Sequence, residues 1–126
     1  MNAPTIAVVD DDDSVRAALD NLLRSMGMTV VTFGSAEEFL DSPRRDEVSC
    51  LVADVQMPGM GGLALHRQLA AESRRVPIIL ITAFPKDHVR REVEADGAFG
   101  YLAKPFESAS LLACIDRALD EGHTGA

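Results

Sequence analysis

Short apolar runs alternate five times with longer amphipathic segments along this chain. The runs lie at residues 5–9, 28–33, 50–53, 76–81 and 98–103, and most have the β-branched and aliphatic composition of buried strands. Between them, apolar residues recur at helical spacing, as at Val15, Leu19 and Leu22. This alternation predicts an α/β fold: a doubly wound parallel sheet of five strands with five helices covering its two faces.

Capping residues indicate where the first helices begin and end. Asp13 or Ser14 is expected to cap the first helix, and Gly27 is expected to end it. Ser35, with Glu38 three residues later, predicts a short second helix that opens with a capping box.

Helix signals also indicate the last two helices, and the chain length indicates the number of domains. Pro85 suits the first turn of a fourth helix that ends near residue 96, and the last helix is expected at residues 107–120. The 126 residues fit one domain. We expect that domain to cover residues 1–122 and to be followed by a frayed tail at residues 123–126.

Composition and charge restrict the class of protein. The chain is 47% hydrophobic and 25% charged, as expected of a soluble globular protein. No apolar run approaches the roughly 20 residues of a membrane span, and no secretory signal is recognisable, so we expect a cytoplasmic protein. A net charge of −8 without a basic stripe argues against direct nucleic-acid contact. Cys50 and Cys114 lack CxxC spacing and are expected to be buried thiols.

Polar side chains follow four of the predicted strands. Asp10 and Asp11 follow the first strand, Asp54 the third, Thr82 the fourth and Lys104 the fifth. Ligands of open parallel sheets bind at the carboxyl ends of the strands. These five side chains are therefore expected to form one site.

The residue types of this site suit phosphoryl chemistry. Three carboxylates in one cleft repel one another and require a cation, and oxygen ligands suit Mg²⁺ or the similar Mn²⁺. A carboxylate beside such an ion can attack phosphorus and form an aspartyl phosphate. A lysine and a threonine are suitable partners for the phosphoryl oxygens.

Four segments together resemble the receiver domains of response regulators. They are residues 8–12 (VVDDD), 54–60 (DVQMPGM), 81–83 (ITA) and 100–106 (GYLAKPF). Their order and spacing extend the resemblance over essentially the whole chain. It implies the flavodoxin-like receiver fold with strand order 2-1-3-4-5. Residues 35–40 and 50–60 are most similar to the receivers of FixJ-like transcription regulators.

The resemblance implies a role for each site residue. Asp54 is expected to be the phosphoacceptor, and the metal is expected to be held by Asp10, Asp11, Asp54 and the backbone carbonyl of Gln56. Thr82 and Lys104 are expected to contact the phosphoryl group.

Two further residues enter only through this resemblance. Tyr101 is expected to be an aromatic switch that turns inward on phosphorylation. The peptide bond preceding Pro105 is expected to be cis.

The implied function is a two-component signalling switch. A sensor histidine kinase or a phosphotransfer protein is expected to donate the phosphoryl group, and the chain is expected to catalyse only its own phosphorylation and dephosphorylation. The expected output surface is formed by the fourth helix, fifth strand and fifth helix, which would also allow a phosphorylation-dependent homodimer. A stand-alone receiver and the N-terminal part of a DNA-binding regulator both fit the sequence, so the output is a partner protein or the protein's own effector domain.

Two other functions fit the sequence less well. An aspartate-nucleophile phosphatase needs a general-acid aspartate two residues after the nucleophile, where this chain has Gln56. A pseudo-receiver that is never phosphorylated is disfavoured by the intact set of site residues. Phe84 and Pro85 differ from the small or polar residues of many receivers, which leaves the phosphoryl lifetime open.

Overall fold

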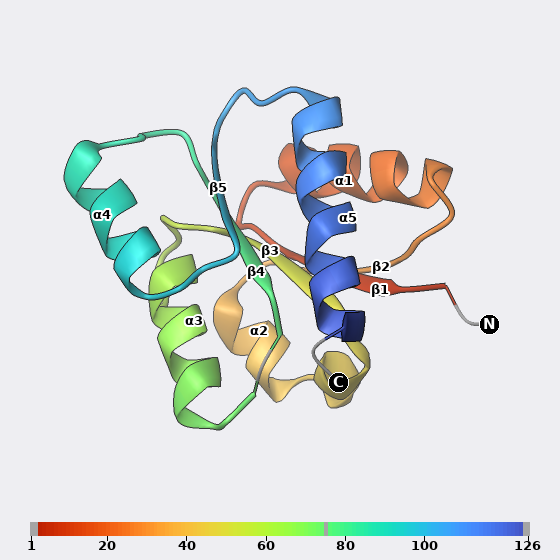
Figure 1. Ribbon diagram of the computed structural model, residues 1–126, viewed down its shortest axis with the longest axis horizontal. Helices are drawn as coiled ribbons and strands as arrows, with labels where there is room; N and C mark the ends of the chain where they lie inside the picture. Colours follow the sequence, from red (N-terminus) through yellow and green to blue (C-terminus); the bar gives the residue numbers. More distant parts are fainter. Residues whose placement is uncertain (1–2, 75, 125–126) are drawn as a thin grey trace.

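Five parallel strands form the centre of the computed structural model, which describes residues 3–74 and 76–124 (Figure 1). The strands are β1 (Thr5–Val9), β2 (Thr29–Phe33), β3 (Cys50–Asp54), β4 (Ile78–Thr82) and β5 (Gly100–Ala103). Their order in the sheet is β2-β1-β3-β4-β5, so the predicted fold and strand order are confirmed.

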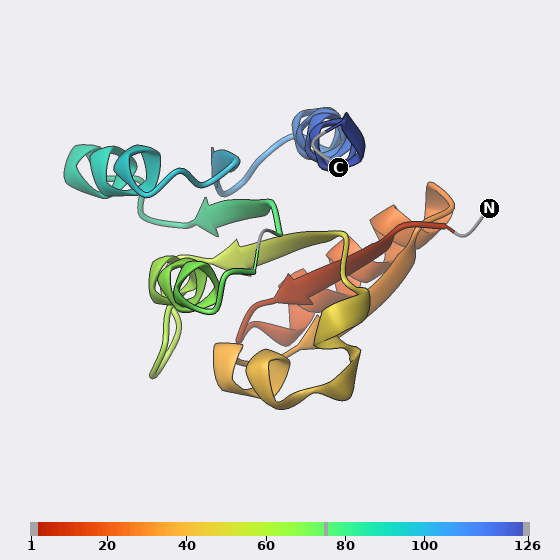
Figure 2. The same ribbon diagram turned by 60° about the horizontal axis from the view of Figure 1, so that its bottom comes forward.

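Helices cover both faces of the sheet. The helices are α1 (Asp13–Ser25), α2 (Ala36–Asp41), α3 (Gly62–Ala71), α4 (Asp87–Ala95) and α5 (Ser108–Thr124), with a short 3₁₀ helix, η1 (Pro43–Glu47), before β3. One core cluster joins α1 and α5 to the sheet, and a second joins α2, α3 and α4 to the opposite face. Figure 2 shows α5 and α2 on opposite sides of the strands.

The central strands are apolar because both of their faces are covered. Every residue of β3 and of β4 is buried, and Ile78 to Ile81 are completely inaccessible to solvent. Cys50 and Cys114 are buried free thiols, as predicted, and they lie in the core cluster that joins α1 and α5 to the sheet. None of the described helices is long and apolar enough to cross a membrane.

The N-terminal cap of α1 differs from the prediction. The cap is Asp12, whose Oδ1 accepts hydrogen bonds from the backbone N–H groups of Ser14 at 2.8 Å and Val15 at 3.3 Å. Asp13 is already helical. The helix ends before Gly27, as expected, and this glycine has a φ of +84°.

The last two helices differ from the prediction in where they begin or end. Helix α4 starts at Asp87, so the prediction that Pro85 lies in its first turn is wrong. The N-cap position is Lys86, whose side chain makes no capping hydrogen bond. Helix α5 continues to Thr124, so residues 123–124 of the expected tail are helical, and residues 125–126 lie outside the described part of the chain.

Candidate functional site

The strand register brings the predicted site residues to one edge of the sheet. Asp54 ends β3 opposite Ile81 of β4, and Thr82 ends β4 opposite Ala103 of β5. Asp10 directly follows β1, whose Val9 pairs with Ala53 of β3. Four strands therefore end at one level, and the polar residues at their ends or directly after them meet there.

Three carboxylates gather at this edge. One oxygen each from Asp10, Asp11 and Asp54 lies within 4.8 Å of the others. Asp10 is fully buried and Asp54 is 7% exposed, whereas Asp11 is open to solvent. A set of oxygen donors with one exposed side fits a hard divalent cation that keeps some of its water, such as Mg²⁺.

Lys104 lies between two of these carboxylates. Its Nζ is 3.0 Å from Oδ2 of Asp10 and 2.8 Å from Oδ2 of Asp54. Burial raises the pKa of the Asp10 carboxyl, and the nearby Asp54 charge adds to this, against the lowering by the Asp12 N–H and Lys104. Burial alone would lower the pKa of Lys104, but its bonds to Asp54 and Asp10 outweigh it and raise that pKa. The lysine is therefore held as an ammonium.

Backbone groups fix the second oxygen of each buried carboxylate. Oδ1 of Asp10 accepts from the N–H of Asp12 at 2.9 Å, and Oδ1 of Asp54 accepts from the N–H of Gln56 at 2.8 Å. The guanidinium of Arg16 donates to the Asp10 carbonyl at 2.5 Å. The sequence gives no sign of this contact, because a six-residue separation between Asp10 and Arg16 is not a recognised motif.

The loop that carries Gln56 passes very close to the end of β3. A Cβ atom on Gly61 would lie 2.3 Å from the carbonyl oxygen of Val55, and one on Gly62 would lie 2.6 Å from that of Asp54. Only glycine permits this approach without a backbone shift.

Thr82 and Lys104 are linked through the ends of β4 and β5. Thr82 is fully buried, and its Oγ1 accepts from the N–H of Phe84 at 3.0 Å. The backbone N–H of Lys104 donates to the Thr82 carbonyl at 2.7 Å. The peptide bond between Lys104 and Pro105 is cis, the isomer that the family resemblance implied.

Tyr101 lies on β5, away from the carboxylates. Its ring is partly buried against the cluster formed with α2, α3 and α4, and its hydroxyl is shielded from solvent without a hydrogen-bond partner among the described residues. Burial raises the pKa of this phenol. The guanidinium of Arg90 on α4 lies 5.9 Å from the centre of the ring, a cation–π contact that the sequence did not indicate.

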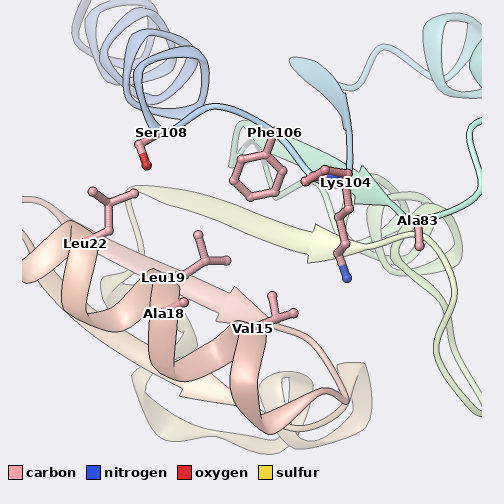
Figure 3. Close-up of a pocket in the computed structure, with 9 residues that line it drawn as sticks. Val15, Ala18, Leu19, Leu22, Ala83, Lys104, Phe106 and Ser108 are labelled. Carbon is pink, nitrogen blue, oxygen red and sulfur yellow. The ribbon is translucent and has the colours of Figure 1, made fainter.

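An apolar groove adjoins Lys104 (Figure 3). One wall is the face of α1 that carries Val15, Leu19 and Leu22, and the other is the segment from Lys104 to Ser108, including Phe106. The hollow has a volume of about 570 Å³. The site therefore has an apolar surface directly beside its charged centre.

Comparison with known proteins gives consistent matches. Residues 6–116 match the profile of the response regulator receiver domain. Nodulation protein W of Bradyrhizobium diazoefficiens is 43% identical over 110 residues, which are 87% of this chain and 48% of that protein. The chain spans about half the length of nodulation protein W and of two other relatives, the transcriptional regulatory protein TdiR of Thauera aromatica and the response regulator protein TodT of Pseudomonas putida.

Solved structures agree with the sequence matches. The response regulator StyR superposes with a TM-score of 0.89 at 44% identity, covering 98% of this chain and 62% of that one. The structure of FixJ-N superposes with a TM-score of 0.84 at 34% identity, covering 95% of this chain and 96% of that one.

Proposed function

This chain belongs to the response regulator receiver domains, and on that premise we propose that it is a phosphorylation switch whose phosphoacceptor is Asp54. The main support is the cluster of Asp10, Asp11 and Asp54 beside Lys104, in which one oxygen of each carboxylate lies within 4.8 Å of the others. This arrangement combines a nucleophilic carboxylate, a place for a cation and a fixed positive charge.

The proposed reaction is an in-line phosphoryl transfer. A carboxylate oxygen of Asp54 attacks the phosphorus of a phosphohistidine, forming a P–O bond as the P–N bond breaks. The electron pair of the broken bond stays on the histidine nitrogen. Mg²⁺ or Mn²⁺ held by Asp10, Asp11, Asp54 and the Gln56 carbonyl would neutralise charge on the phosphoryl oxygens.

Two side chains would bind the transferred group. The Lys104 ammonium, 2.8 Å from Asp54, is close enough to pair with a phosphoryl oxygen on that residue. The Thr82 hydroxyl accepts a hydrogen bond from Phe84 and keeps its own hydrogen for donation. A bond from Thr82 to the phosphoryl group would draw this strand end toward Asp54.

Phosphorylation would then shift the protein between two conformations. A bound group shifts such an equilibrium only if it interacts differently with the two states. Contacts of Thr82 and Lys104 with the phosphoryl group would provide that difference. We propose that the surface formed by α4, β5 and α5 responds, with Tyr101 as the side chain that changes position.

The groove beside Lys104 suits the phosphodonor. A helix of a sensor histidine kinase or of a phosphotransfer protein could place its apolar face in the groove and its phosphohistidine at Asp54. We propose a cytoplasmic receiver domain with no direct contact of its own to nucleic acid or membrane. Its output would pass to a partner protein, to a second copy in a homodimer, or to an effector domain of the same protein.

Incubation with Mg²⁺ and acetyl phosphate tests the proposal. Intact-mass analysis should show the addition of one phosphoryl group to the wild type and none to Asp54→Asn. Asp116→Asn, at an exposed position of α5, is the control and should be labelled like the wild type. Absence of labelling in the wild type would support a pseudo-receiver, and labelling of Asp54→Asn would contradict the site assignment.

A further inference from the structure

The loop between β3 and α3 connects the proposed phosphoacceptor to the expected carbonyl ligand of the metal. It spans residues 55–61 and contains no helix or strand. Its first half is held by the sheet: the Val55 N–H donates to the Ile81 carbonyl at 2.8 Å, and the Gln56 N–H donates to Asp54. Met57 is buried in the core.

The second half of this loop is held from a different helix. Oε2 of Glu37, in the first turn of α2, accepts a hydrogen bond from the N–H of Met60 at 3.2 Å, across 23 residues of sequence. A Cβ atom on Gly59 would lie 2.8 Å from the same oxygen. The carboxylate therefore rests directly on the backbone of Gly59 and Met60.

We propose that Glu37 is a positioning residue for the metal-binding loop, an inference that rests on the proposed function. Glu37 lies on an exposed helix turn and is not one of the expected ligands. By fastening residues 59–60 to α2, it limits the conformations of the loop that carries the Gln56 carbonyl.

The physical basis is preorganisation. Ordering a loop backbone costs conformational entropy, and a loop that is already ordered does not incur this cost when a ligand binds. Removing groups that orient metal ligands typically lowers metal affinity by about 10- to 100-fold. Glu37 acts through the loop and not on a ligand atom, so we expect the lower end of that range.

Glu38 provides a matched control. It lies in the same turn of α2, carries the same charge and is also exposed. Its Oε2 accepts from the N–H of Gly34 at 3.0 Å, so it fastens the β2–α2 turn instead of the metal-binding loop. Loss of Glu38 removes an equal charge and a comparable hydrogen bond without releasing residues 59–60.

The experiment is a Mg²⁺ titration followed by amide NMR on four proteins: wild type, Glu37→Ala, Glu37→Gln and Glu38→Ala. Glu37→Ala should bind Mg²⁺ about tenfold more weakly and should show faster hydrogen exchange at the Met60 amide before Mg²⁺ is added. Glu37→Gln keeps a carbonyl acceptor, so it and Glu38→Ala should stay within about twofold of the wild type.

Each other outcome overturns a specific statement. Equal Mg²⁺ affinity of Glu37→Ala and the wild type would disprove the positioning role and leave the proposed function intact. An equal loss in all three variants would show that net charge, and not the loop contact, determines affinity. A wild type that does not bind Mg²⁺ would overturn both the inference and the metal site on which it rests.

Discussion

The Nζ atom of Lys104 lies 2.8 Å from Oδ2 of Asp54, although the two residues are 50 positions apart in the sequence. The contact depends on the sheet, because β3 and β5 are separated by β4 and must end at the same level. The same ammonium lies 3.0 Å from Asp10, so one positive charge serves two buried carboxylates. A change at Lys104 should therefore affect both the stability of the fold and the charge balance of the proposed phosphorylation site.

Replacing Lys104 with methionine should destabilise the protein when no divalent cation is added. The variant leaves Asp10 and Asp54 without their ammonium partner. We expect the free energy of unfolding at pH 7 to fall by about 2 kcal/mol, less than for a fully buried pair, because the lysine side chain is 19% exposed. Urea denaturation measures this loss.

Added Mg²⁺ should restore part of the lost stability, because it supplies positive charge to the same carboxylates. NaCl of equal ionic strength should restore less. The control is Lys86→Met at the exposed N-cap of α4, which should change stability little with or without Mg²⁺. If Lys104→Met were as stable as the wild type in metal-free buffer, the ammonium would not be needed to balance these charges.

Asp10 should make stability depend on pH. Burial raises its folded-state pKa above the ordinary value of 3.8, so the folded protein binds this proton more tightly than the unfolded chain does. Ionisation of Asp10 therefore lowers the free energy of unfolding as the pH rises above 3.8, and the loss is complete above the raised pKa.

Asp10→Asn should remove this dependence. In metal-free buffer its free energy of unfolding should exceed that of the wild type by about 1 kcal/mol near pH 7, and the difference should shrink toward pH 4. Urea denaturation at a series of pH values measures the difference. Asp41→Asn, at an exposed position of α2, is the control. A lower stability of Asp10→Asn at every pH would mean that its hydrogen bonds outweigh the cost of burying its charge.

The sheet and the residues at its carboxyl edge could be predicted because both depend on local patterns. The run from Ile78 to Ile81 is apolar without interruption, as a strand covered on both faces must be. Asp10, Asp54, Thr82 and Lys104 stand at strand ends, and the parallel arrangement alone brings strand ends together. No knowledge of side-chain packing was required.

Contacts between helices could not be predicted in this way. Neither His66 nor Arg90 belongs to a ligand or binding pattern in the sequence. His66 is half-buried on α3, and burial lowers the pKa of its imidazole. Arg90 is exposed but lies over the ring of Tyr101. Both environments depend on how α3 and α4 pack on the sheet, and no local pattern specifies that packing.

Removing the hydroxyl of Tyr101 should stabilise the protein. The hydroxyl is buried without a hydrogen-bond partner among the described residues, and such a group costs about 1–3 kcal/mol. Tyr101→Phe keeps the ring and its contact with Arg90, so the free energy of unfolding should rise by about 1 kcal/mol. Thermal and urea denaturation would both detect this change. A loss of stability would show that the hydroxyl is hydrogen-bonded in solution.

Gly61→Ala should be among the most damaging small substitutions in the loop after β3. The added Cβ would lie 2.3 Å from the carbonyl oxygen of Val55, a backbone atom that cannot rotate away. The loop must therefore shift, and we expect a loss of about 2–3 kcal/mol in the free energy of unfolding, as for other overpacked positions.

Gly27→Ala is the comparison for Gly61→Ala, because it introduces backbone strain without a steric clash. Gly27 has a φ of +84° and nothing within 4 Å of the position of an added Cβ, so its substitution should cost only about 1 kcal/mol. The two variants should also differ in Mg²⁺ affinity, measured by titration on the folded proteins. Gly61→Ala displaces the loop that carries Gln56 and should bind Mg²⁺ more weakly, whereas Gly27 lies beyond the other end of α1 and should leave binding unchanged. Equal Mg²⁺ affinities would mean that the loop accommodates the methyl group without moving the Gln56 carbonyl.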